Sequence, residues 1–197
     1  MRSALLFALG FGLSMAGASP LGVFLVDHAV ATGFDPGRAG LVLALGSGAS
    51  IAMRLIVGRA ADRRDAGHLR WVASMVLIGV IGFMMLATEI PILMVIGAVV
   101  AFAFSWGFNG LFWYSVLRAH PASPGAMTGM VTPGGLIGGL IGPLIYGLVA
   151  ETFSYRMAWI VAGLLAACGS VAMFACARMV ERQRAATSCG ASGTGAP

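Results

Sequence analysis

Lysine is absent from this chain, and charged residues of any kind are scarce. Charged side chains make up 10% of the 197 residues, and all twelve basic residues counted beside the three histidines are arginines. Without lysine there is no phosphate-binding Gly-Lys motif, and neither a His-Glu-x-x-His nor a His-x-x-Glu-His zinc motif is present. We therefore expect neither a nucleotide-driven pump nor a metallohydrolase, and no metal or cofactor.

The residues that an intramembrane protease needs are missing as well. Such an enzyme places a serine nucleophile and a histidine base within one bundle. Around Ser47 a glycine comes directly before the serine instead of two residues before it, and His68 and His120 fall in loops. The cysteines stand at no metal-ligand spacing, so we interpret the two in an apolar segment as small packing residues. They are Cys168, Cys176 and Cys189. We do not expect an enzyme.

Long apolar runs dominate what is present, since 59% of the residues are hydrophobic. A run of about 20 apolar residues crosses the hydrocarbon core of a bilayer as a helix, and its backbone must be satisfied internally. Six runs reach that length, at residues 3–26, 39–57, 71–88, 90–117, 121–150 and 157–177. The chain is therefore predicted to be an all-α membrane protein, with one six-helix transmembrane domain over residues 1–180. Residues 181–197, rich in Ser, Gly, Thr and Ala, are predicted to be a disordered cytoplasmic tail.

The arginines predict the orientation of the helices. One set of loops and ends carries Arg2, Arg54, Arg59, Arg63, Arg64, Arg70, Arg118, Arg178, Arg182 and Arg184. The opposite loops carry only Arg38 and Arg156. The positive-inside rule places both termini in the cytoplasm, and we expect a bacterial inner membrane protein. Because the arginines lie in short loops beside the bilayer, they indicate orientation, and a nucleic-acid partner is not expected.

The N-terminal run has two interpretations. Ala16, Gly17 and Ala18 resemble a signal-peptidase site after an arginine and an apolar segment. The uncharged run continues to Val26, which is longer than a typical signal segment and favours an uncleaved first span.

The loop after the second run carries a distinctive pattern of Gly58, Asp62 and Arg63. Gly58 permits close packing of a neighbouring helix, and Asp62 could pair with an arginine to form a charge lock on one side of the bundle. The alternative is a loop whose arginines only set topology.

Three motifs, including this one, carry a family resemblance. They are Arg54-x-x-x-Gly58-x-x-x-Asp62-Arg63, Gly138-x-x-x-Gly142-Pro143-x-x-x-Gly147 and Ser154-Tyr155-Arg156-x-x-Trp159. Together they resemble the major facilitator superfamily, in which the first motif joins the second and third helices of each six-helix half. Asp65, where the family usually has glycine, and the late Gly67 depart from that motif.

The resemblance implies secondary active transport of a small solute by alternating access, with Gly58, Asp62 and Arg63 as a cytoplasmic gate. It implies one half of a twelve-helix transporter, most similar to the C-terminal half. A truncated or split gene product, a separate partner half and a homodimer are the open explanations. A non-transporting module or relic that needs a partner half is the alternative function.

Four residues are candidates for the solute site. Arg54 is the only charge within a run, so it either faces a cavity or extends its long side chain to the nearby interface. Trp106, Asn109 and Trp113 recur at helical spacing on one face, where an amide between aromatic rings suits a small organic solute. Helix packing and the interfacial aromatic belt are the alternatives.

A glycine stripe and an acid–histidine pair are two further features of the sequence. Gly134, Gly138 and Gly142 form a stripe of small residues at four-residue spacing, typical of close helix packing, with Pro133 and Pro143 as possible bends. Asp27 and His28 end the first run and could take part in proton coupling, although such residues are more often hydrated.

Overall fold

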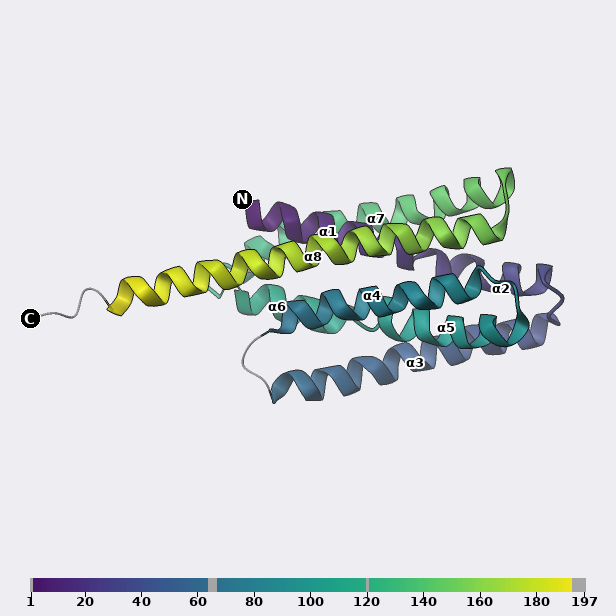
Figure 1. Cartoon of the computed structure of the whole chain (residues 1–197), viewed down its shortest axis with the longest axis horizontal. Helices are drawn as coiled ribbons and strands as arrows, with labels where there is room; N and C mark the ends of the chain where they lie inside the picture. The colour runs from purple at the N-terminus through teal and green to yellow at the C-terminus, as the bar shows by residue number, and fades with distance from the viewer. Residues whose placement is uncertain (1, 64–66, 120, 193–197) are drawn as a thin grey trace, which may run out of the picture.

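The computed structural model describes residues 2–63, 67–119 and 121–192 as an elongated bundle of helices (Figure 1). The described helices are α1 (Arg2–Ala18), α2 (Pro20–Ala31), α3 (Pro36–Asp62), α4 (His68–Leu86), α5 (Pro91–Ser105), α6 (Asn109–Ala119), α7 (Pro124–Thr152) and α8 (Tyr155–Ser192). They form six segments that are long and apolar enough to cross a membrane. The prediction of an all-α protein with six transmembrane helices is confirmed.

Two of the six spans are interrupted near their middle. The first span, Ala4–Ala31, consists of α1 and α2, which meet at Ser19. Pro20 lacks a backbone N–H and stands at the start of α2, so one bond of the helical ladder is missing there, although Ser19 keeps helical dihedral angles. The fourth span, Pro91–Ala119, consists of α5 and α6, separated by residues 106–108. The prediction that Trp106, Asn109 and Trp113 share one helix face requires a continuous helix in the fourth span, which the structure does not have.

The ends of the bundle are defined by the chain termini. The N-terminus and the end of α8 lie at the same end, which we call the terminal end (Figure 1). The opposite end, where α2, α4 and α7 finish, is the distal end. At the terminal end α8 continues to Ser192, so residues 181–192 are helical, whereas composition predicts a disordered tail over residues 181–197. Alanine and arginine, which recur there, are strong helix formers. Residues 193–197 of that tail lie outside the described residues.

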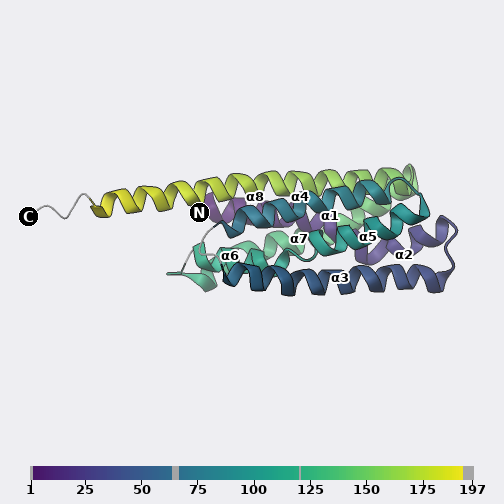
Figure 2. The same cartoon turned by 60° about the horizontal axis from the view of Figure 1, so that its bottom comes forward.

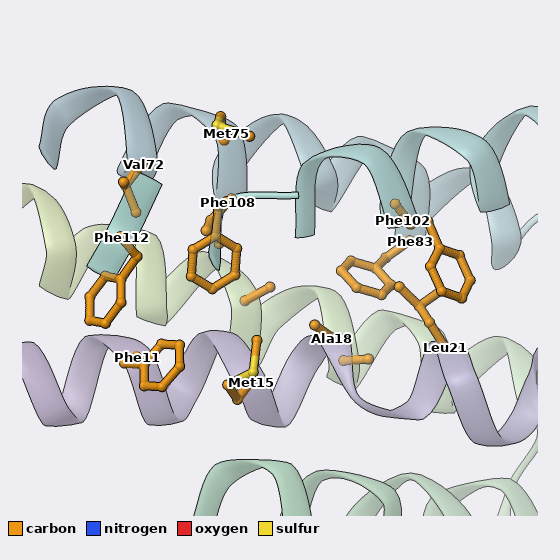
Figure 3. Packing of buried hydrophobic residues seen from close by; sticks show 14 of the residues in the cluster. Phe11, Met15, Ala18, Leu21, Val72, Met75, Phe83, Phe102, Phe108 and Phe112 are labelled. Carbon is orange, nitrogen blue, oxygen red and sulfur yellow. The ribbon is translucent and has the colours of Figure 1, made fainter. Parts of the chain in front are cut away.

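The core joins α1 to the interrupted fourth span. The ring of Phe11 stacks on Phe112 at a centroid distance of 4.5 Å, and Phe108 meets Phe11 edge-on at 6.2 Å. In Figure 3, Phe108 and Phe112 point toward Phe11 and Met15 of α1. These rings are buried, and they hold the fourth span against the first.

The glycine stripe of α7 lies directly against α1. A Cβ atom on Gly138 would meet the carbonyl oxygen of Gly12, while Gly134 and Gly142 approach the backbones of Ala8 and Ala16 in the same way. Both helices therefore present small residues at four-residue spacing, and their backbones are in contact. Helices in a bilayer have no hydrophobic driving force for association, so the van der Waals contact between these two backbones stabilises the pair instead.

The second span, α3, lies at an edge of the bundle in both views (Figures 1 and 2). It packs mainly on α5, with α2 and α6 as lesser neighbours. Of the described spans, α3 and α7 are the least buried. Their exposed apolar side chains include Leu41, Leu45, Ile51, Leu55, Ile56, Leu136, Ile137, Leu140 and Leu144.

Candidate functional site

Trp106 stands at the break between α5 and α6, where carbonyl groups leave the regular helical ladder. Its carbonyl oxygen accepts a hydrogen bond from Nη2 of Arg54 at 3.2 Å and from Nδ2 of Asn109 at 3.3 Å. A backbone carbonyl freed inside a membrane needs such partners, because water is absent there. The break is thus stabilised by an arginine from another helix.

The same tryptophan also contacts the break in the first span. Its indole Nε1 donates a 2.9 Å hydrogen bond to the carbonyl oxygen of Ala18, immediately before Ser19 and Pro20. Trp106 therefore connects both interruptions, one through its side chain and one through its carbonyl. Helices that are interrupted near the middle of a span form the solute sites of many membrane transporters.

An open pocket of about 320 Å³ lies beside this junction. It is lined by Gly22, Ser47, Ser50, Ile51, Arg54, Phe102 and Trp106. The lining combines one guanidinium, two hydroxyl groups and two aromatic rings. A guanidinium and hydroxyl groups can bind an anionic group, while aromatic rings can pack on an apolar moiety. The lining therefore suits a small organic anion.

Helix α3 supplies the polar wall of the pocket. Ser47, Ser50 and Arg54 are spaced by three and four residues, so they lie on one face of α3. Arg54 is exposed and stands eight residues before the helix ends at Asp62, which is about 12 Å along the axis. The two serines were not among the predicted site residues, although this spacing would have indicated them.

The four predicted solute-site residues divide into two groups. Arg54, Trp106 and Asn109 meet at one carbonyl, but Asn109 does not line the pocket. Trp113 lies elsewhere, with its ring 5.4 Å from both Phe11 and Phe112. The break at residues 106–108 interrupts the single helical face that the spacing predicted.

The predicted gate residues lie among the last residues of α3 and directly after it, at the terminal end of the bundle. Gly58 has open space at its Cβ position, and Asp62 and Arg63 are exposed. Across the described ranges 2–63, 67–119 and 121–192, Asp62 has no ion-pair partner. Arg64 and Asp65 fall outside the described residues. A charge lock formed by Asp62 therefore stays a prediction.

An ion pair that the sequence analysis did not predict is present at this end. Nη2 of Arg70, on α4, lies 2.5 Å from Oε2 of Glu181 on α8. The two residues are 111 positions apart in the sequence, and no local motif joins them.

The comparisons with known proteins agree with this architecture. The family model of the Major Facilitator Superfamily matches residues 7–194, which is nearly the whole chain. None of the curated proteins matches the chain. The match spans all six apolar segments, and members of this family are membrane transporters of small molecules. The chain is an integral membrane protein that belongs to the major facilitator superfamily.

Proposed function

We propose that this transporter carries a small organic anion, and that the solute binds in the pocket between Arg54 and Trp106. The hydrogen bond from Arg54 to the Trp106 carbonyl is the observation that supports the proposal, because it holds a guanidinium at the wall of an open pocket beside the break in the fourth span. A carboxylate can replace the carbonyl as the acceptor and gain a two-pronged, charge-assisted interaction.

The other pocket residues suit the remainder of such a solute. Phe102 and Trp106 offer apolar ring surfaces, while Ser47 and Ser50 provide hydroxyl groups on the same side as Arg54. The pocket volume of about 320 Å³ fits a molecule with a single ring. Benzoate is therefore a suitable probe, and benzamide is its uncharged counterpart of the same shape.

The proposed mechanism is alternating access of this half against a second half. The interruptions at Ser19 and at residues 106–108 are places where the two halves of a span can tilt. Gly22, three residues after the first interruption, and Trp106, at the second, both line the pocket. Release of the Trp106 carbonyl by Arg54 would then accompany solute binding. Gly58, Asp62 and Arg63 would close the cytoplasmic side, and Pro133 and Pro143 would bend α7.

A second six-helix half, or a second copy of this chain, is the proposed partner. The least buried spans, α3 and α7, carry the exposed apolar side chains that a partner could cover. The arginine distribution supports cytoplasmic termini in a bacterial inner membrane. The alternative function remains a membrane module that does not transport without its partner.

Uptake into vesicles tests the proposal. Membrane vesicles that contain the chain should accumulate benzoate faster than vesicles without it, and benzamide should not compete. Arg54→Gln should abolish the difference, whereas Arg59→Gln, on the same helix outside the pocket, should not. Equal competition by benzamide would exclude an anion carrier. If uptake appears only when a partner half is co-expressed, autonomous transport is excluded.

A further inference from the structure

His28, near the distal end of the bundle, is fully buried and makes a specific hydrogen bond. Its Nδ1 atom accepts a 2.8 Å hydrogen bond from the indole Nε1 of Trp159 on α8. Because an indole nitrogen is only a donor, Nδ1 must be unprotonated in this arrangement. The ring hydrogen of the neutral imidazole is then on Nε2.

The Nε2 atom faces a carboxylate. Oε1 of Glu89, in the turn between α4 and α5, lies 4.0 Å away, and the Glu89 side chain is 45% exposed. Nε2 has no hydrogen-bond partner within the described part of the chain, and the Glu89 carboxylate is an acidic acceptor within 4.0 Å of it. Glu89 also has a φ of 60°, a left-handed conformation that is unusual for glutamate.

The other groups around His28 carry no charge of their own. The Tyr155 ring, from α8, stacks on the imidazole at 5.0 Å, and Tyr146, from α7, meets Trp159 at 4.6 Å. Helix α5 has no titratable residue. The remaining charged groups near this end are exposed: they are Asp27 on α2, Asp35 and Arg38 at the start of α3, Glu151 on α7 and Arg156 on α8.

We propose that His28 is a proton-binding site in which the proton and the Trp159 indole compete for the same nitrogen. A proton taken from water can add only at Nδ1, since Nε2 already carries a hydrogen. The new N–H then faces the indole N–H, so the hydrogen bond between α2 and α8 must break. The resulting imidazolium needs a counter-charge, and the Glu89 carboxylate supplies it.

Proton binding is therefore linked to packing at the distal end. In the neutral state His28 joins α2 to α8 through the hydrogen bond with Trp159. In the protonated state it joins α2 to the turn between α4 and α5 through the ion pair with Glu89. The site could thus couple a proton to the opening of this end. This inference does not depend on the solute or on the Arg54 pocket.

Nuclear magnetic resonance of the full chain in lipid nanodiscs tests the site directly. The chain contains only three histidines and four tryptophans, so labelling with ¹⁵N at both residue types gives few signals. On acidification from about pH 8 to about pH 3, a range that extends well below the ordinary titration of histidine, the His28 ring and the Trp159 indole should change over the same interval. The distance from Nε2 of His28 to the Glu89 carboxyl carbon should shorten at the acidic end.

His28→Gln is the matched variant, because its amide oxygen still accepts from the indole but does not titrate. The Trp159 signal of this variant should lose its pH response while its hydrogen-bonded position at neutral pH persists. A His28 ring that stays neutral through the whole range would overturn the proposal. So would protonation of His28 that leaves the Trp159 signal unchanged, or a Trp159 response that survives in His28→Gln.

Discussion

The indole of Trp106 and the carbonyl of Ala18, 88 residues apart in the sequence, form a 2.9 Å hydrogen bond at the crossing of two interrupted helices. The carbonyl of the same tryptophan accepts from Arg54, so one residue connects three spans. A break in a transmembrane helix exposes polar backbone to an apolar solvent, and it persists only where such partners exist. The junction therefore explains both why the helices break here and why a charge is tolerated nearby.

Replacement of Trp106 by phenylalanine tests the junction. The substitution keeps an aromatic ring but leaves the Ala18 carbonyl without its donor, which should lower the free energy of unfolding by about 1–2 kcal/mol. Unfolding in mixed detergent and SDS measures the effect. Trp113→Phe is the control, because its ring contacts with Phe11 and Phe112 are retained. Equal losses in both variants would mean that the bond to Ala18 contributes nothing specific.

The contact between α1 and α7 predicts a contrast between adjacent glycines. Gly138→Ala places a methyl group against the Gly12 carbonyl and should destabilise the fold by about 1–3 kcal/mol. Gly139→Ala meets nothing within 4 Å and should be neutral or slightly stabilising, since alanine favours a helix. The yield of monodisperse protein and its thermal stability in detergent report the difference. Similar behaviour of the two variants would contradict the observed packing.

The ion pair of Arg70 and Glu181 should contribute little. Both side chains are well exposed, at 56% and 42%, and exposed pairs typically contribute about 0–1 kcal/mol. Glu181→Gln should therefore change the free energy of unfolding by less than about 1 kcal/mol, and added salt should remove the difference. A larger loss that persists in high salt would show that α4 and α8 depend on this pair.

The proposed gate predicts a kinetic effect without a structural one. Asp62 is exposed at the end of α3, so Asp62→Asn should leave the amount of protein in the membrane unchanged. If Asp62 forms a charge lock during transport, uptake should slow by several-fold, since a charged partner loses its counter-charge. The initial rate of benzoate uptake at equal membrane levels measures this. An unchanged rate would remove Asp62 from the mechanism.

The spans were predictable from the sequence, but their interruptions were only partly so. Membrane spans follow from length and apolarity alone, which are local properties. A bend in the first span follows from Pro20 itself, since proline cannot continue the helical ladder. The break after Ser105 has no proline, and its partners, Arg54 and Ala18, come from distant spans. Such a break is determined by tertiary contacts.

The site was predictable to the same limited degree. Arg54 stood out because it is the only charge within an apolar run, and Trp106 because of its spacing from other aromatic residues. Trp113 was grouped with them on the assumption of one continuous helix, which the break at residues 106–108 invalidates. The solute-binding role of these residues stays a prediction, and so does a hinge role of Gly134, Gly138, Gly142 and Pro143 in transport.

Equilibrium binding to the purified chain tests the central proposal most directly. Titration calorimetry should show that benzoate binds and that benzamide binds far more weakly, because only the carboxylate pairs with Arg54. In Arg54→Gln the benzoate affinity should fall by about ten-fold to a hundred-fold, as expected when a hydrogen bond to a charged group is lost, while Arg59→Gln should bind normally. Equal affinity for benzoate and benzamide, or an unchanged affinity in Arg54→Gln, would contradict an anion site between Arg54 and Trp106.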